Sequence, residues 1–287
     1  MKAMILAAGL GTRLRPLTDS RPKALVEVAG RTLLEITLTR LRSFGVDEVI
    51  INVHHFADLV VDYLKSHVNF GMRIKVSRED DLLLDTGGGL KKAAWFFLED
   101  ARQAANSPTA ENKTKRVIPS EARNRGKAPT QPKDDRTPGP SVNPDEPFLL
   151  HNVDVISNID LRRMIQFHIE NGALATLAVQ SRESSRLLLF NDQNQLVGRH
   201  ASSDTSNSPL LTRYSPLAFS GIHVISPRLL PMLTEKGVFS IIDAYLRLAA
   251  KGEKILAFRA DEYYWRDLGR PSDLSQAARD LQQHVVE

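Results

Sequence analysis

The sequence predicts an α/β fold whose central sheet is open, mostly parallel and covered by helices. Short apolar runs of strand length alternate with segments in which apolar residues recur at helical spacing, which is the pattern of parallel α/β sheets. The first apolar run passes directly into a glycine turn, as a strand that feeds a tight loop does. With 287 residues and 42% hydrophobic content, the chain can bury one large core or two modest ones. Ligands of such folds bind outside the carboxyl ends of the strands.

The first hundred residues supply the alternation of strand and helix. The run at 49–53 is apolar apart from Asn52, as in strands that are covered on both faces. Gly45 follows a helical pattern and provides its stop. The predicted strands are 3–8, 49–53 and 72–76, and the predicted helices contain Leu34, Leu38 and Leu41, then Leu59, Val60, Tyr63 and Leu64, then Lys91 to Phe97.

After residue 143 the same pattern resumes and then changes. Residues 186–200 read as a hairpin around Asn191 to Asn194, which predicts a small β extension beside the main sheet. The other predicted strands are 148–156, 175–179 and 219–225, and the predicted helices contain Leu161, Met164, Ile165 and His168, then residues near 227–250, then Asp273 to Val285.

Residues 101–143 interrupt this organisation. They contain six prolines and no aromatic residue, so they cannot bury enough apolar surface to offset the entropy of ordering. We expect this segment to be a disordered, low-complexity insertion, with a basic tether to a partner as the alternative. Residues 1–100 and 144–287 are expected to form one domain.

Composition excludes several classes of function. The chain has no cysteine, so it has neither disulfides nor a thiolate metal site. The net charge of +4 is accounted for by residues 101–143, so it does not indicate a nucleic-acid partner for the folded part. No apolar run reaches the length of a membrane span. We expect a cytoplasmic protein without nucleic-acid or membrane partners, and homo-oligomerisation is left open.

The glycine turn after the first strand predicts a polyphosphate site. Gly9 and Gly11 let backbone N–H groups turn toward an anion, and Arg13, Arg15, Arg21 and Lys23 add more positive charge than one monophosphate needs. No Lys-Ser or Lys-Thr follows these glycines, so the turn is not a P-loop. Leu14 stands where the dinucleotide fingerprint needs a third glycine, which argues against a nicotinamide-dependent oxidoreductase.

Four further positions carry a chemical signal. Gly87 to Gly89 precede a helix, which is costly unless the backbone bends tightly or touches something flat, such as a base. Asp154 lies in an apolar strand, where a carboxylate needs a cation such as Mg²⁺. Gly221 interrupts a strand and marks close approach of a ligand. His54 falls at a strand end and is either a loop histidine with local hydrogen bonds or a substrate contact.

The run Leu-Ala-Ala-Gly-x-Gly-Thr-Arg-Leu-x-Pro-Leu-Thr at 6–18, followed by Pro22-Lys23-x-Leu25, resembles the signature of the sugar-1-phosphate nucleotidyltransferases. The resemblance implies a Rossmann-like, GT-A-like fold. It implies that Arg13 assists pyrophosphate departure and that Lys23 contacts phosphate. The residues that would then hold the triphosphate are Leu6, Ala7, Ala8, Gly9, Gly11 and Thr12.

Three later segments extend the resemblance. Asp85 to Gly89 resembles the Leu-Glu-Thr-Gly-Gly-Gly segment of N-acetylmuramate 1-phosphate uridylyltransferases, with Asp85 in place of glutamate. Residues 152–155 resemble Asn-Gly-Asp-Val, and residues 265–269 resemble Trp-x-Asp-Val-Gly. The roles implied are nucleotide binding for Asp85, Thr86, Gly87 and Gly88, sugar binding for Asn152, Gly221 and His54, and Mg²⁺ binding for Asp154 and Asp267.

The resemblance implies an enzyme that joins a nucleoside triphosphate to a sugar 1-phosphate and releases pyrophosphate. The triple glycine favours UTP. GTP with mannose 1-phosphate and a non-catalytic subunit that senses nucleotide sugars remain alternatives, and the sugar and the number of Mg²⁺ ions stay open. Some members of the family carry a Glu-Lys-Pro motif that binds the sugar phosphate. This chain has no such motif, and by the resemblance the uridylyltransferase branch lacks it too.

Overall fold

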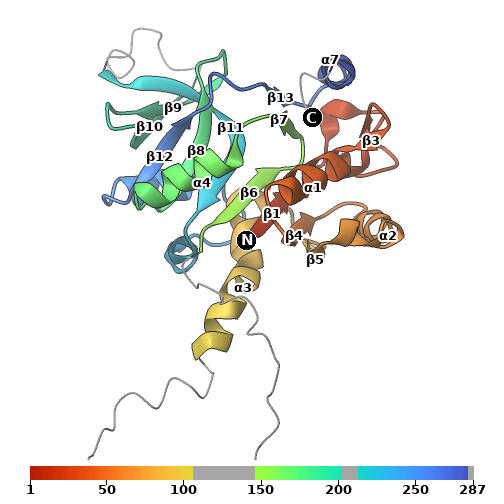
Figure 1. Cartoon of the computed structure of the whole chain (residues 1–287), viewed down its shortest axis with the longest axis horizontal. Coiled ribbons are helices and arrows are strands. Elements are labelled where there is room, and N and C mark those ends of the chain that lie inside the picture. Colours follow the sequence, from red (N-terminus) through yellow and green to blue (C-terminus); the bar gives the residue numbers. More distant parts are fainter. Residues whose placement is uncertain (106–145, 202–212, 284–287) are drawn as a thin grey trace, which may run out of the picture.

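The computed structural model describes residues 1–105, 146–201 and 213–283 (Figure 1). The predicted insertion therefore lies outside the described residues, apart from 101–105, which complete a helix. Among the described residues, no helix combines the length and the apolar character needed to cross a bilayer.

One large sheet organises the chain, and the predicted α/β class is confirmed. Its main path runs in the order β10-β9-β11-β6-β1-β4-β5, and β8 pairs with both β11 and β12. All its strands except β10 and β11 run in one direction. The strands of this sheet are β1 Lys2–Leu6, β4 Glu48–Val53, β5 Arg73–Arg78, β6 Phe148–Asn152, β8 Ala175–Gln180, β9 Arg186–Phe190, β10 Leu196–Ala201, β11 Ser215–Ile225 and β12 Ile255–Arg259.

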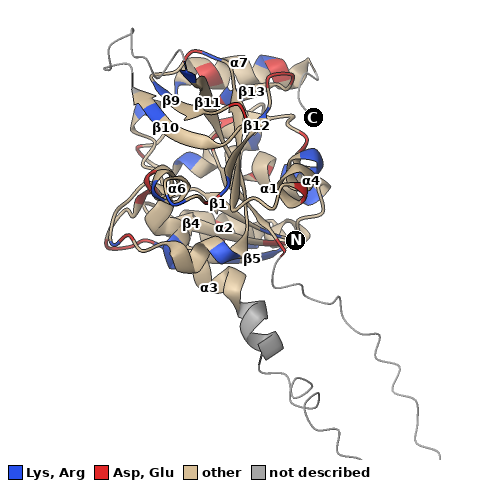
Figure 2. Cartoon of the chain, turned by 90° about the vertical axis from the view of Figure 1, so that its left-hand side faces the viewer, with Lys and Arg blue, Asp and Glu red and all other residues tan. Residues whose placement is uncertain are grey.

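Helices cover both faces of this sheet, with α3 and α6 on one face and α1 and α4 on the other (Figure 2). Short ladders lie outside it, namely β2 Glu27–Val28 with β3 Arg31–Thr32, and β7 Val155–Ser157 with β13 Trp265–Asp267. The helices are α1 Leu33–Ser43, α2 Ala57–Ser66, α3 Asp85–Ala105, α4 Leu161–Glu170, α6 Ile241–Ala249 and α7 Pro271–Gln282, with 3₁₀ turns η1 Thr12–Leu14, η2 Lys23–Leu25, η3 Val68–Gly71 and η5 Pro227–Met232.

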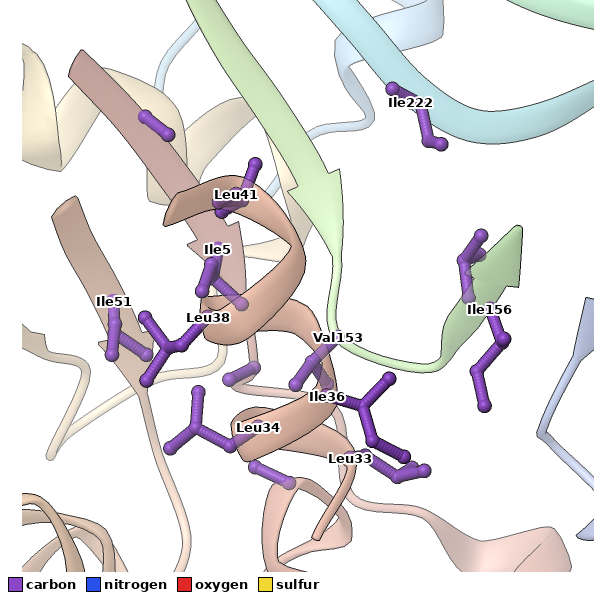
Figure 3. Close-up of a cluster of buried hydrophobic side chains, with 14 of the residues drawn as sticks. Ile5, Leu33, Leu34, Ile36, Leu38, Leu41, Ile51, Val153, Ile156 and Ile222 are labelled. Carbon is purple, nitrogen blue, oxygen red and sulfur yellow. The ribbon is translucent and has the colours of Figure 1, made fainter. Parts of the chain in front are cut away.

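The strands of the sheet centre are apolar on both sides because both faces are covered. In β1, Ile5 joins the core beneath α1 and α2, whereas Met4 joins the core beneath α3. Leu34 and Leu38 of α1 pack on this first core, as Figure 3 shows. Burial of such side chains contributes roughly 1.5–3 kcal/mol each relative to exposure. The covered sheet fixes where the carboxyl ends of β1, β4 and β6 meet.

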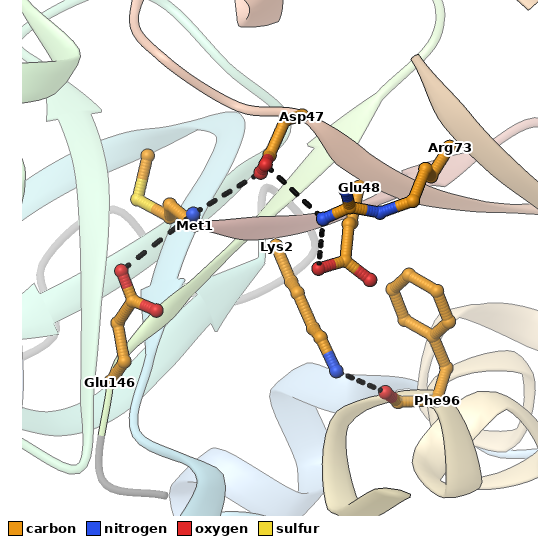
Figure 4. Close-up of polar contacts among 7 residues, drawn as sticks. All are labelled: Met1, Lys2, Asp47, Glu48, Arg73, Phe96 and Glu146. Atoms are coloured by element: carbon orange, nitrogen blue, oxygen red, sulfur yellow. Dashed lines mark hydrogen bonds and ion pairs between the residues drawn. The ribbon is translucent and has the colours of Figure 1, made fainter. Parts of the chain in front are cut away.

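The amino ends of the same strands are tied together by polar contacts (Figure 4). Lys2 Nζ donates to the Phe96 carbonyl at 2.9 Å, and Arg73 bridges Asp47 and Glu48 at 3.2 and 2.7 Å. Exposed ion pairs of this kind contribute only about 0–1 kcal/mol. These contacts join the amino ends of the strands to one another and to α3.

Two predicted boundaries are wrong. The helix expected at Lys91 begins at Asp85, so the three glycines form its first turns and not a loop ahead of it. The strand expected over 148–156 breaks into β6 and β7, because the chain turns at Val153, whose N–H donates to the Leu6 carbonyl at 3.1 Å. This turn places Asp154 at the carboxyl end of β6. The predicted hairpin over 186–200 is confirmed as β9 and β10.

Candidate functional site

Two adjoining cavities open at the carboxyl ends of β1 and β6. The first, which we call the strand-end cavity, has a volume of about 360 Å³, and the second, the loop cavity, has about 350 Å³. Leu6, Gly9, Leu83 and Asp154 line both, so the two form one cleft. Asn52, Asp85, Thr86 and Asn152 are further linings of the strand-end cavity, and Thr12, Arg13, Lys23 and Gly269 are further linings of the loop cavity.

Gly9 and Gly11 in the turn after β1 differ in how much space surrounds them. A Cβ added at Gly9 would meet no atom within 4 Å, so this residue leaves space open at the junction of the cavities. Gly11 has φ of 65°, and its Cβ would lie 2.9 Å from Thr18 Cγ2 and 3.2 Å from Lys23 Cβ. Gly11 is therefore required by the turn, whereas no contact with a described residue requires a glycine at position 9.

Four consecutive backbone N–H groups, those of residues 9–12, donate to no other described residue. All four residues line the loop cavity. Unpaired N–H groups in a glycine turn form a concave anion site. The neighbouring Ala7 N–H is already used, because it donates to Asn52 Oδ1 at 2.8 Å. Sequence reasoning expected Leu6, Ala7 and Ala8 in this site; Leu6 and Ala7 line the loop cavity, whereas Ala8 lines the strand-end cavity.

Lys23 and Asp154 form an ion pair across the loop cavity, although 131 residues separate them. Lys23 is held at the start of η2 and is only 7% exposed. A buried ammonium needs a charged partner, and Asp154 Oδ2 supplies it. The pair fixes a cation beside the unpaired N–H groups.

Asp267 lies beside Asp154 because β13 pairs with β7, with Asp267 opposite Val155. The Leu268 N–H also donates to the Asp154 carbonyl at 2.8 Å. Burial raises the pKa of Asp267, and the Asp154 carboxylate raises it further, while Lys23 acts in the opposite direction. The two predicted metal ligands thus meet, although 113 positions separate 154 from 267.

The absence of a side chain at Gly269 lets Arg13 lie close to Asp267. A Cβ at Gly269 would lie 2.5 Å from both Arg13 Nη2 and Asp267 Oδ1, and its N–H donates to Asp267 Oδ1 at 2.8 Å. Arg13 Nη2 is 4.0 Å from the same oxygen. Any side chain at 269 would push the two charges apart, so this glycine is part of the site.

The two carboxylates fit a hard divalent cation. Asp154 Oδ1 and Asp267 Oδ2 receive no hydrogen bond from any described residue, and both groups border the loop cavity or its Gly269 rim. No group of three or more His, Cys, Asp or Glu side chains suited to a metal occurs in the part of the chain that the structure describes. Mg²⁺ is commonly held by one or two carboxylates together with substrate phosphates and water, which is what this pair offers.

The triple glycine has a protein reason that sequence reasoning missed. A Cβ at Gly87 would lie 2.3 Å from the Phe239 ring, one at Gly88 would lie 2.7 Å from the Gly237 carbonyl, and one at Gly89 would lie 2.8 Å from Asn52 Nδ2. The N–H groups of Gly87 and Gly88 also donate to the Phe239 carbonyl. Close packing of α3 therefore accounts for these glycines, and their contact with a base stays a prediction. Asp85 and Thr86 do line the strand-end cavity.

A buried carboxylate beneath the strand-end cavity was not foreseen. Glu79 is 1% exposed, accepts from Asn52 Nδ2 at 2.7 Å and accepts from the Leu84 N–H at 2.9 Å. Asn52 in turn holds Ala7, so the contacts connect three segments around the cleft. In the sequence Glu79 is the first of three acidic residues, which gives no signal that it alone is buried.

The predicted sugar residues divide into two groups. Asn152 lines the strand-end cavity, and Gly221 packs on it, because a Cβ at Gly221 would lie 2.9 Å from Asn152 Nδ2. Gly221 also has φ of 75°, at a register shift in β11. The structure brings His54 to neither cavity: His54 Nδ1 contacts the Glu79 carbonyl, which matches the local alternative.

Comparisons with known proteins find sugar-1-phosphate nucleotidyltransferases among the similar sequences. Residues 2–107 match the model of the family described as nucleotidyl transferase. An N-acetylmuramate alpha-1-phosphate uridylyltransferase of Caulobacter vibrioides is 54% identical over 106 residues, covering 36% of this chain and 44% of that protein. A UTP–glucose-1-phosphate uridylyltransferase of Synechocystis is 26% identical and covers 97% of this chain and 63% of that protein. A mannose-1-phosphate guanyltransferase of Candida albicans is 26% identical over 95% of this chain and 62% of its own length.

Solved structures share the fold. A putative glucose-1-phosphate thymidylyltransferase from Bacillus anthracis has a TM-score of 0.70 at 16% identity, covering 99% of this chain and 96% of that one. A UDP-glucose pyrophosphorylase in complex with UDP-glucose has a TM-score of 0.66 at 16% identity, covering 98% of both chains. At these identities the likeness establishes the fold alone. The chain spans between 44% and 63% of the length of the curated relatives named above.

Proposed function

We propose that the chain transfers a nucleotidyl group from a nucleoside triphosphate to a sugar 1-phosphate, with UTP as the favoured donor, because residues 2–107 match the nucleotidyl transferase family model. One observation carries the proposal. The Lys23–Asp154 ion pair, Asp267 and Arg13 gather beside a run of backbone N–H groups that have no acceptor within the described residues. Such a site has cations and N–H donors for a polyphosphate and carboxylates for a metal ion.

The reaction needs alignment and charge neutralisation from the protein. An oxygen of the sugar phosphate forms a bond to the α-phosphorus of the triphosphate. The bond from that phosphorus to the oxygen between the α- and β-phosphates breaks, and its electron pair leaves with pyrophosphate. The second pKa of a phosphate monoester is near 6, so the attacking group is already an anion at neutral pH. No protein nucleophile or base is required.

Each charged residue then has a defined part. The N–H groups of residues 9–12 bind phosphate oxygens of the triphosphate. Lys23, which is paired with Asp154, neutralises phosphate charge beside them. Arg13, held at the Gly269 rim, lies where the pyrophosphate can be stabilised as it leaves. Asp154 and Asp267 would hold Mg²⁺, which neutralises phosphate charge and orients the triphosphate.

The preference for UTP rests on similarity to a uridylyltransferase over the 106 matched residues. Transfer of GMP to mannose 1-phosphate is the second candidate, because the similarity to a mannose-1-phosphate guanyltransferase extends over 95% of this chain. A few pocket contacts separate such substrates, at about 1–3 kcal/mol each. A non-catalytic sensing subunit is disfavoured, because Lys23, Asp154 and Asp267 are all retained and meet in one cleft.

The test is a matrix of pyrophosphate-release assays. UTP, GTP, CTP and dTTP are each combined with N-acetylmuramate, glucose and mannose 1-phosphates in the presence of Mg²⁺, and the nucleotide sugar is identified by mass. We expect the UTP rows to be the most active. Activity confined to GTP would replace the donor assignment, and no pyrophosphate from any pair would refute the proposed function.

A further inference from the structure

A polar cluster outside the two cavities surrounds Trp265 of β13. Trp265 Nε1 donates to the Ser220 carbonyl at 2.7 Å. The guanidinium carbon of Arg182 lies 3.7 Å from the centroid of the indole ring, and Arg182 Nη2 donates to the Phe219 carbonyl at 2.7 Å. The guanidinium is therefore held over the ring by a cation–π contact and a hydrogen bond.

The cluster has hydrogen-bonding capacity that the protein does not use. Arg182 Nε, Ser157 Oγ and Ser220 Oγ are buried and have no hydrogen-bond partner within the described residues. Ser157 lies opposite Trp265 in the β7–β13 ladder, and Ser220 contacts the indole through its carbonyl. The three residues that carry these atoms each contact or pair with Trp265. Buried polar groups are normally paired, so this gathering points to a polar guest or to bound water.

The cluster borders the metal carboxylates. Trp265 and Asp267 are two residues apart in β13, so their side chains project from the same face of the strand. Burial lowers the pKa of Arg182, and the nearby Asp267 carboxylate acts in the opposite direction. No carboxylate of the described residues forms an ion pair with Arg182. On the other side, Ser220 precedes Gly221, which packs on Asn152 at the wall of the strand-end cavity.

We propose that Arg182 binds an oxyanion of the acceptor substrate, an inference that rests on the proposed function. The oxyanion is the 1-phosphate or a carboxylate that the sugar carries. A planar guanidinium with a free Nε–H suits either group, because it can donate two parallel hydrogen bonds to them.

The experiment compares Arg182→Gln, Arg182→Lys and Arg186→Gln with the wild type. Arg186 is an exposed arginine at the start of β9 and serves as the matched control. Initial rates give the KM for the triphosphate and the KM for glucose 1-phosphate and N-acetylmuramate 1-phosphate separately. Isothermal titration of each sugar phosphate, without triphosphate, gives Kd values that do not depend on turnover.

Arg182→Gln is expected to raise the acceptor KM and Kd about 10- to 100-fold, which is the range for losing a hydrogen bond to a charged group. The KM for the triphosphate should stay unchanged. Arg182→Lys is expected to lie between Gln and the wild type, because it keeps the charge without the planar fork. Equal losses for both sugars place Arg182 on the phosphate, and a loss confined to the N-acetylmuramate compound places it on the carboxylate.

Other outcomes separate the two claims. If the wild type forms no nucleotide sugar from any pair, the proposed function fails and this inference fails with it. If the wild type is active and Arg182→Gln keeps the wild-type acceptor KM and Kd, only the inference is overturned. A parallel rise in the triphosphate KM, or a loss of equal size in Arg186→Gln, would also overturn it, because the effect would then be a general disturbance of the fold or surface charge.

Discussion

Gly9 and Gly11, the two glycines of the turn that follows β1, should respond in opposite ways to the same added methyl group. Gly9 has a φ outside the left-handed region, and its Cβ would touch nothing within 4 Å. Gly9→Ala should therefore fold normally, and it should gain about 0.4–1 kcal/mol in unfolding free energy through the lower entropy of the unfolded chain. The methyl group would stand at the junction of the two cavities and hinder approach to the N–H groups of residues 9–12.

Gly11→Ala is the matched counterpart. Its φ of 65° costs an alanine about 1–2 kcal/mol. The contact of 2.9 Å with Thr18 Cγ2 forces a further shift of the turn, and overpacking of this kind costs about 1–3 kcal/mol. The two variants should thus differ by roughly 2–6 kcal/mol in unfolding free energy, with Gly9→Ala the more stable.

Urea denaturation measures the unfolding free energy of each variant, and pyrophosphate-release assays measure its KM for the triphosphate. Gly9→Ala should raise the KM for the triphosphate about 10- to 100-fold, which corresponds to weakening one or two hydrogen bonds to a charged group. Thermal protection of Gly9→Ala by triphosphate should fall in parallel. A Gly9→Ala variant that unfolds as easily as Gly11→Ala, or that keeps the wild-type KM, would refute the assignment of Gly9 to ligand approach.

Three further variants follow from the structure. Asp154→Asn should lower turnover about 10²- to 10³-fold in Mg²⁺, measured against Asp19→Asn as an exposed control. Glu79→Gln should lower the unfolding free energy by about 1–3 kcal/mol in urea, because its amide group would face a donor from either Asn52 or Leu84. His168 is 2% exposed, and burial lowers its pKa to about 4, so protonation is disfavoured in the folded state. Its contribution to stability is present above the unfolded pKa of 6.5 and is lost as the pH falls toward 4, amounting to about 3 kcal/mol, and His168→Gln should flatten this part of the pH profile.

Each of these has a contrary result. Wild-type turnover of Asp154→Asn in Mg²⁺ would remove that carboxylate from the metal site. An unchanged urea midpoint for Glu79→Gln would mean that the buried contacts to Asn52 Nδ2 and the Leu84 N–H are not stabilising. An acid profile of His168→Gln that matches the wild type would place the loss of stability elsewhere, and His55→Gln, an exposed histidine, controls for the change in charge.

Local pattern predicted most of the elements because each depends on a few neighbours in the sequence. The apolar run at 49–53 became β4, and the hairpin at 186–200 became β9 and β10. The pattern failed at the triple glycine, where intrinsic propensity argues against a helix. Packing against Phe239 and Gly237 decides that α3 begins at Asp85, and no local signal contains those contacts.

By itself the sequence determined the α/β class, the glycine turn with its cations, and the residue types that point to phosphate and metal chemistry. These depend on spacing along the chain, which is read directly. The resemblance implied that Asp154 and Asp267 both bind Mg²⁺, but only the tertiary structure decided how they meet, that Gly269 admits Arg13, that Glu79 is buried, and that His54 faces a backbone carbonyl. The reason is that β7 and β13 pair across more than a hundred residues, and burial follows from that folding of distant segments onto one another.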